Sequence, residues 1–494
     1  MRRIWQSRPG WRLAGLAFGA GAVAALGHAP LYLWPLTVLG LAGLVRLVAG
    51  AARGAGWIGL LGGTGYGVVA LSWIVEPFLI EPEVYGWMAP FALVFMGLGL
   101  GAFWALAAWG ARVLPFGNRA MGFAATLTAV EFLRGHILTG FPWAMPGHVW
   151  ISTPVAQLGA FVGPTGLTLG VMVLAAALSA LRLWPGVLAG AGLAVAWGFG
   201  LWVLAQPMPV DRGAVLRLVQ PNAEQALKWD PDQARVFFDR LLTASAAEPR
   251  VDLVIWPETA LPYLLERHAE LAPMIAGAAG GAVVALGAQR AEGSQFWNSL
   301  VVIGPDGTVA QSYDKHHLVP FGEYIPLGDL AFRLLGLRAF AAQEGAGYTA
   351  GAGPALIDFG PEMGLALPLI CYEAVFPQDV NAAPARAGWL LQITNDAWFG
   401  TISGPFQHAD QARMRAIEQG LPLVRVANTG VTAVYDARGR LRASLPFGVE
   451  AHLDAALPGP LAPTPFARWG EAPALVLLAG LALWSIRRRA SKHP

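Results

Sequence analysis

Three residues suited to acyl transfer follow apolar segments in the second half of the sequence. Glu258, Lys315 and Cys371 each stand at the end of an apolar run typical of a buried strand. Side chains at the ends of adjacent strands meet at one edge of a sheet. A carboxylate that takes the thiol proton, a thiolate that attacks an acyl carbon and an ammonium that stabilises the oxyanion would transfer acyl groups through a thioester.

Structural interpretations of the same residues stay open at this point. A lone cysteine at a strand end is often a buried core thiol, and Glu258 and Lys315 also fit ordinary surface positions at strand ends. The neighbouring His316 and His317 suggest a metal site. Adjacent histidines on a strand point in different directions, however, and no third ligand at metal spacing is apparent, so hydrogen-bonding roles are favoured.

Alternating strand and helix patterns surround these residues. Each of two successive series contains β-α-β units and closes with a hairpin, which predicts an α/β sandwich with an internal repeat. The expected strands and hairpins are 214–222, 251–258, 281–289, 298–315, 355–360, 364–373, 389–396, 422–428 and 432–444, and the expected helices are 233–248, 266–280, 377–387 and 407–420.

The first two-fifths of the chain has a different composition. The whole sequence is 55% hydrophobic and 13% charged, with a mean hydropathy of +0.50, whereas soluble domains carry about 25% charged residues. Residues 1–205 contain no Asp or Lys and only four of the 31 acidic residues. The net charge of +2 gives no indication of nucleic-acid binding, and the single cysteine excludes an intramolecular disulfide framework.

Eight apolar runs have the length of membrane spans, about 17–25 residues. They are 11–27, 31–49, 55–75, 87–112, 119–138, 162–183, 186–205 and 471–487. Arginines gather in alternate loops and in the basic tail 488–494, which predicts that these parts and both termini are cytoplasmic. The predicted organisation is a seven-span membrane domain (1–205), an extracytoplasmic domain (214–456), a linker (457–470) and an eighth span.

Two details of the membrane part allow alternatives. The first apolar run also fits a signal peptide, although a polytopic domain needs its first helix for packing. Glu131 and Arg134 are one helical turn apart near the outer end of the fifth span. They form either a self-neutralising pair or part of a lipid headgroup site.

Several motifs resemble those of the bacterial apolipoprotein N-acyltransferases, membrane members of the nitrilase superfamily. They are WPETALP (256–262), YDKHHLVPFGEYIPL (313–327), ICYE (370–373), QALKWDP (225–231) and GFPWAMPGH (140–148). The resemblance covers essentially the whole chain. It implies a polytopic α-helical membrane domain of about eight spans with an inserted nitrilase-like α-β-β-α sandwich.

The resemblance also implies roles for individual residues. Glu258 would be the general base, Lys315 the oxyanion-stabilising cation and Cys371 the nucleophile. Glu323 looks like the family's second essential acid, Tyr372 and Glu373 match the residues that follow the cysteine, and Trp229 matches a tryptophan on a loop near the site. Neither a metal nor a cofactor is expected.

The expected activity is a two-step transfer of an acyl chain from a membrane phospholipid to the S-diacylglyceryl-cysteine of an apolipoprotein at the bacterial inner membrane. Apolar loops over Cys371 would exclude water, and the segments around Trp229 and 328–348 are the candidates. Two alternatives remain: a membrane-tethered amidase or nitrilase that hydrolyses a small C–N substrate, and a transporter whose outer domain only binds ligand. The near absence of charged residues in the spans disfavours the transporter.

Overall fold

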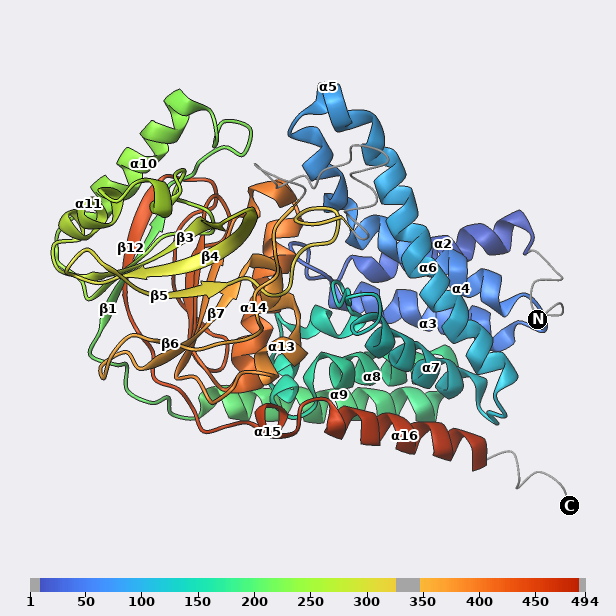
Figure 1. Ribbon diagram of the computed structural model, residues 1–494. Coiled ribbons are helices and arrows are strands. Elements are labelled where there is room, and N and C mark those ends of the chain that lie inside the picture. The colour runs from blue at the N-terminus through green and yellow to red at the C-terminus, as the bar shows by residue number, and fades with distance from the viewer. Residues whose placement is uncertain (1–8, 326–346, 488–494) are drawn as a thin grey trace, which may run out of the picture. The chain divides into compact units, whose positions relative to one another are not determined.

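The computed structural model describes residues 9–325 and 347–487, which form two compact units (Figure 1). The helical unit comprises the chain up to Pro207, Phe399–Gln419 and the chain from Pro463 on. The α/β unit comprises Met208–Trp398 and Gly420–Ala462. The chain therefore leaves the helical unit twice and returns to it twice.

Apolar helices make up the helical unit, and each of the eight apolar runs carries one in the described part of the chain. They are α2 (Trp11–Ala25), α3 (Trp34–Gly50), α4 (Ala55–Ala70), α6 (Ala89–Val113), α7 (Arg119–Arg134), α8 (Gly159–Ser179), α9 (Leu183–Ala205) and α16 (Ala472–Arg487). Shorter elements connect them, namely η1 (Ser72–Leu79), α5 (Pro82–Tyr85), η2 (Gly86–Met88), η3 (Pro146–Trp150), η4 (Pro154–Leu158) and α15 (Pro465–Trp469), where η denotes a 3-10 helix.

The length and composition of these helices fit a membrane only in part. Among the described residues, Pro82–Val113, Pro154–Ser179 and Leu183–Ala205 are long and apolar enough to cross one. Helices α4 and η1, whose axes are bent by 50° at the break between them, provide a fourth crossing if they are treated as one span. The number of spans and the predicted domain limits stay predictions.

Small residues bring the helices of this unit close together. A Cβ on Gly21 in α2 would lie 1.8 Å from the carbonyl oxygen of Gly62 in α4, a distance that excludes every other residue type. Such close backbone approach is typical of helices that pack through small side chains in a membrane.

Glu131 and Arg134 form a buried ion pair inside the helical unit. The indole of Trp104 also donates to Glu131 at 2.9 Å, and Arg134 donates to the carbonyls of Phe141 and Trp143. The pair is thus self-neutralising and fixes the segment that follows α7. Its role toward a lipid stays untested.

Two mixed six-stranded sheets form the α/β unit. The first has the order β12-β1-β2-β3-β4-β5 and the second β11-β10-β9-β8-β7-β6. The strands are β1 (Val215–Gln220), β2 (Leu253–Ile255), β3 (Val283–Glu292), β4 (Gln295–Ile303), β5 (Val309–Asp314), β6 (Ile357–Asp358), β7 (Leu365–Ile370), β8 (Trp389–Thr394), β9 (Leu423–Ala427), β10 (Ala433–Tyr435), β11 (Leu441–Ser444) and β12 (Ala451–Ala456).

The two sheets repeat one pairing pattern. From β12 to β5 the neighbouring strands are antiparallel, parallel, parallel, antiparallel and antiparallel. The same sequence of pairings runs from β6 to β11. Each half of the α/β unit therefore contains three parallel strands followed by a hairpin, as the sequence patterns predict, and an extra antiparallel strand at the other edge.

Apolar side chains hold two helices against the first sheet. Helices α10 (Pro231–Ser245) and α11 (Leu271–Ala278) lie along this sheet in Figure 1. Phe238 and Leu241 of α10 and Ile275 of α11 are buried in one cluster with Val254 and Val284. This cluster supports β2, the strand that leads to Glu258.

Some expected elements differ in the structure. Strand β12 lies where no strand was expected, β6 has only two residues, and the helix expected over 377–387 is α13 (Pro377–Asn381). Helix α14 (Gly404–Gln419), which lies inside the predicted domain 214–456, packs with α8, α15 and η4 of the helical unit. Sequence patterns give the type of such elements but not the unit against which they pack.

Candidate active site

The three candidate catalytic residues follow strands of two different sheets. Glu258 lies three residues after β2 and Lys315 directly after β5, both in the first sheet, whereas Cys371 directly follows β7 of the second. The expectation that adjacent strands of one sheet bring them together is therefore wrong. Strand ends of both sheets therefore supply the site.

Lys315 is the electrostatic centre of the site. Its side chain is 1% exposed, and its Nζ lies 2.9 Å from Glu323 and 3.5 Å from Oε1 of Glu258. Burial alone would lower the pKa of Lys315, but the charges of Glu323 and Glu258 outweigh it and raise the pKa above its usual value. The lysine is consequently held as an ammonium group.

Asn298, on β4, joins the two carboxylates around the lysine. Its buried Nδ2 donates to Oε1 of Glu258 at 2.7 Å and to Oε1 of Glu323 at 3.0 Å. The backbone N–H of Val319 donates to the other oxygen of Glu323 at 2.8 Å. These bonds fix both carboxylates relative to Lys315.

Glu258 has two further neighbours that sequence reasoning missed. The backbone N–H of Asn395 donates to its Oε2 at 2.8 Å. The ammonium of Lys228 donates to the Glu258 carbonyl at 3.3 Å and to the hydroxyl of Thr259 at 2.7 Å. Burial lowers the pKa of Lys228 to about 8, although Glu258 counteracts this. A second cation therefore lies behind the candidate base.

Cys371 occupies a sharp turn between a strand and a helix. It is buried, with a φ of 51°, and it begins η6 (Cys371–Val375) immediately after β7. Positive φ is uncommon for a residue with a Cβ and is typical of functional sites. The turn directs the thiol away from the line of the strand.

The surroundings of the thiol favour its protonated form at rest. Burial raises the pKa of Cys371, as does the charge of Glu258, whereas Lys315 and a hydrogen bond with Thr394 lower it. The net pKa lies well above the usual value. The nucleophile thus needs a base at the moment of attack. Two of the charged groups that act on it, Glu258 and Lys315, belong to the set named from the sequence, and the charge of Asp396 also raises the pKa of the thiol.

Glu373 ties together the two loops that carry Lys315 and Cys371. Its buried Oε1 accepts from the N–H of His316 and the hydroxyl of Tyr313, both at 2.8 Å, and from the N–H of His317 at 3.3 Å. Its Oε2 accepts from the N–H of Ile370 at 2.7 Å. The Glu373 carboxylate therefore fixes the positions of His316, which follows Lys315, and Ile370, which precedes Cys371, relative to each other.

Tyr372 and Trp229 lie close in the chain to residues of the site. The buried ring of Tyr372 packs edge-on against His317 and Phe376, with centroids 5.7 and 4.8 Å away. Trp229 is partly exposed before α10, and the Lys228 ammonium lies 5.7 Å from its ring centroid. In the other predicted lid segment, 328–348, the residues up to 346 are outside the part of the chain that the structure describes.

The two histidines contact carboxylates. His317 Nδ1 lies 2.7 Å from Asp379, and His316 Nδ1 lies 2.6 Å from Glu373. Burial would lower the pKa of His316, but its bonds with Asp379 and Glu373 raise it to about 9. Among the described residues no group of three or more His, Cys, Asp or Glu side chains is arranged to hold a metal ion.

The paired mixed sheets define the class of this protein. Residues 211–462 match the sequence family Carbon-nitrogen hydrolase, so the α/β unit is a carbon–nitrogen hydrolase domain. The amidase of Nesterenkonia AN1, from the nitrilase superfamily, is a solved structure that is similar over 55% of this chain and 99% of its own, at 19% identity and a TM-score of 0.39.

The rest of the chain narrows this class to one family. Residues 20–177 match the Apolipoprotein N-acyltransferase N-terminal domain. The apolipoprotein N-acyltransferases of Caulobacter vibrioides and Bradyrhizobium diazoefficiens are 38% and 40% identical, each over 98% of this chain and 96% and 97% of their own. The chain belongs to the apolipoprotein N-acyltransferase family.

Proposed function

We propose that this protein transfers an acyl chain from a membrane phospholipid to the N-terminal S-diacylglyceryl-cysteine of apolipoproteins, with Glu258, Lys315 and Cys371 as the catalytic triad. The observation that carries the proposal is the buried Lys315 ammonium beside Glu258, whose charges both act on the thiol of Cys371. Family membership supports this function over the amidase alternative.

In the first half-reaction, the thiol proton passes to the Glu258 carboxylate as sulfur attacks the ester carbonyl of the phospholipid. The ammonium of Lys315 stabilises the oxyanion of the tetrahedral intermediate. The ester C–O bond then breaks, and Glu258 returns the proton to the leaving glycerol oxygen. The products are a lysophospholipid and a thioester on Cys371.

In the second half-reaction, the α-amino group of the apolipoprotein attacks the thioester. Glu258 takes a proton from the nitrogen, the C–S bond breaks, and Cys371 regains the proton as its thiol. An amide is formed, and no cofactor or metal enters either step. Glu323 and Glu373 act as positioning residues, since one holds Lys315 and the other holds the loops on both sides of the site.

The membrane domain has a physical purpose in this scheme. Both substrates carry long acyl chains, and extraction of a chain into water costs about 0.8 kcal/mol per CH₂. A site at the bilayer surface avoids this cost. We place the protein in the bacterial inner membrane with about eight spans, the α/β domain on the extracytoplasmic side and both termini in the cytoplasm, as the distribution of arginines predicts.

Water must be kept from the thioester, because hydrolysis would compete with transfer. The loop of Trp229 is one candidate cover, since its partly exposed ring lies beside the Lys228 that contacts Glu258. Tyr372 supports the opposite side through its packing on Phe376.

Isolation of the acyl-enzyme tests the proposal. The protein is incubated with a phospholipid that carries a radiolabelled acyl chain, and label released by hydroxylamine is expected on the wild type and absent from Cys371→Ala. Product formation by the wild type without such label would contradict the thioester. A gain of one acyl chain on a lipoprotein N-terminal peptide identifies the acceptor, and release of free fatty acid alone would instead favour a hydrolase.

A further inference from the structure

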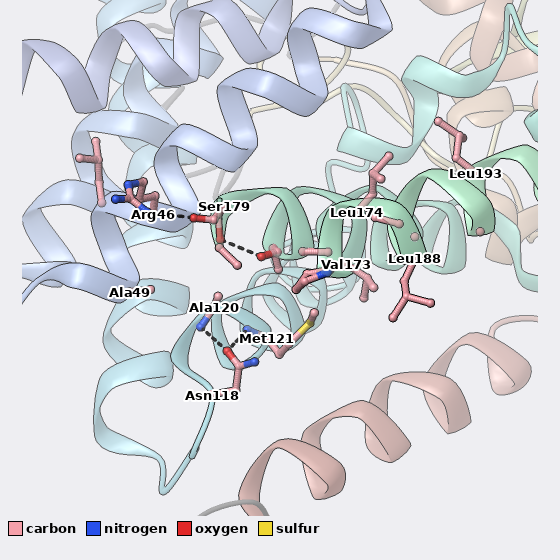
Figure 2. A pocket seen from close by; sticks show the side chains of 18 of the residues that line it. Arg46, Ala49, Asn118, Ala120, Met121, Val173, Leu174, Ser179, Leu188 and Leu193 are labelled. Atoms are coloured by element: carbon pink, nitrogen blue, oxygen red, sulfur yellow. Dashed lines mark hydrogen bonds between the residues drawn. The ribbon is translucent and has the colours of Figure 1, made fainter. Parts of the chain in front are cut away.

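A long apolar groove runs along the helical unit between α3, α8 and α9, away from the catalytic residues in the sequence. Its volume is about 1460 Å³, larger than the roughly 300–1,000 Å³ of usual small-molecule sites. Figure 2 shows Arg46 and Ser179 at one end and Leu193 toward the other. The size and lining indicate a ligand with extended apolar parts.

The groove exists because α9 diverges from its neighbours. A Cβ on Gly200, near the C-terminal end of α9, would lie 2.0 Å from the carbonyl oxygen of Pro154, so the contact with η4 is close there. Toward the N-terminal end, a Cβ on Gly186, Gly190 or Gly192 would meet nothing within 4 Å. Gly200 is the one buried residue of α9.

Small side chains on one face of α8 deepen the groove. Val162, Gly166, Gly170, Val173 and Ala177 line it at helical spacing and therefore share a face. From Val162 the lining continues to Ala180, the residue directly after α8, a distance of about 27 Å at 1.5 Å per residue. This is close to the roughly 30 Å of a bilayer's hydrocarbon core, so the groove is long enough for an extended acyl chain.

The polar end of the groove is positively charged. Arg46 and Arg53 line it, both are exposed, and none of the lining residues is acidic. Within residues 9–325 and 347–487, Arg46 makes a single hydrogen bond, from Nη1 to the carbonyl of Ser179 at 3.1 Å, and Arg53 makes no side-chain hydrogen bond or ion pair. Free guanidinium donors are thus available for a phosphate group.

We propose that this groove binds an anionic diacyl phospholipid, with the headgroup at Arg46 and Arg53 and the acyl chains between α8 and α9. The groove is lined by the N-terminal part of α9. The chain enters the α/β unit after Ala205, at the C-terminal end of this helix. The proposed lipid is bound in addition to the acyl donor, because the lining of the groove includes none of the candidate catalytic residues. The proposal requires these helices to lie in a bilayer but does not depend on acyl transfer.

Photocrosslinking tests the site on the full chain. The protein is reconstituted in phosphatidylcholine nanodiscs with a small amount of phosphatidylglycerol that carries a photoreactive acyl chain. Label is expected on peptides of α8 and α9, and unlabelled phosphatidylglycerol should compete for it while phosphatidylcholine and soluble glycerol phosphate should not. Equal labelling by a photoreactive phosphatidylcholine would overturn the proposal. A crosslink between two copies of the protein at the groove, instead of a lipid label, would also overturn it.

Matched variants separate headgroup recognition from chain burial. Removal of both guanidinium groups in Arg46→Gln/Arg53→Gln should reduce labelling about fivefold per arginine, whereas Arg182→Gln, an exposed arginine outside the lining, should not change it. Gly192→Phe should block the groove, whereas Gly190→Phe, on the same helix but outside the lining, should leave it open. Equal effects of a variant and its control would contradict a defined site.

Discussion

The ammonium of Lys315 lies 2.9 Å from the carboxylate of Glu323, closer than its 3.5 Å separation from Glu258. The candidate base is therefore not the main partner of the lysine. Glu323 neutralises much of the lysine's charge from one side, so that Glu258 is left to exchange protons with the thiol and the substrates.

Glu323→Gln should lower kcat by up to about 10²-fold, because Glu323 positions the oxyanion-stabilising Lys315 and a displacement of about 1 Å has an effect of that size. Without the Glu323 charge, the pKa of Lys315 falls, so the lysine loses its proton at lower pH. The alkaline limb of the pH–rate profile should therefore shift to lower pH. Glu292→Gln, which removes an exposed carboxylate, is the control, and an unchanged profile in Glu323→Gln would contradict the assigned role.

Asn298→Ala should impair catalysis more than stability. It removes the hydrogen bonds to Glu258 and Glu323, and displacement of a catalytic group by about 1 Å costs up to about 10²-fold in rate. Acyl-enzyme formation measured by rapid quench checks this.

Ser299→Ala is the matched control for Asn298, because the neighbouring Ser299 of β4 hydrogen-bonds Asp314 at 2.6 Å and does not contact either carboxylate of the site. Its rate should stay near that of the wild type. Equal losses in both variants would mean that Asn298 supports only the strand.

Glu373→Gln should destabilise the α/β unit by about 1–3 kcal/mol and abolish acyl-enzyme formation. The new amide NH₂ would face backbone N–H donors that now meet a carboxylate oxygen, which leaves buried donors without partners. The unfolding temperature and the hydroxylamine-sensitive label give the two readouts. The exposed Glu362→Gln is the control, and full activity in Glu373→Gln would contradict the proposed positioning.

His316 should make the stability of the protein depend on pH. Its folded-state pKa of about 9 exceeds the unfolded value of 6.5, so protonation favours the folded state. This contribution is complete below pH 6.5 and is lost as the pH rises through about 9. The difference in unfolding temperature between the wild type and His316→Asn should shrink accordingly.

The exposed His452→Asn is the control for this measurement and should show no comparable trend. His316→Asn should still form the acyl-enzyme, because the ring lies outside the triad. A difference from the wild type that grows with pH would contradict the assigned protonation.

Sequence patterns predicted the elements of the α/β unit well because apolar runs and turn residues are local signals. The family and the carbon–nitrogen hydrolase fold are confirmed by the comparisons. Asn298 was missed because it contacts Glu258 across 40 residues, and nothing in the spacing of one sequence reveals such a contact. Asn395 was missed for the same reason, because its backbone N–H reaches Glu258 across 137 residues.

The arrangement of the triad also required the structure. Strand ends are visible in the sequence, but the division of twelve strands between two sheets depends on long-range pairing. Cys371 was expected to end a strand, whereas its positive φ places it in the turn that follows. The catalytic roles of Glu258, Lys315 and Cys371 stay predictions until they are tested.

Helix α14 has a consequence for work with fragments. It lies within the carbon–nitrogen hydrolase match, yet its buried Ala409, Met414 and Ile417 belong to the helical unit. A truncated chain that begins after the seventh apolar helix would carry α14 without its partners α8 and η4 and would expose an apolar surface. Such a fragment should aggregate, so the hydrolase-like half of this enzyme family member is best purified together with its membrane helices.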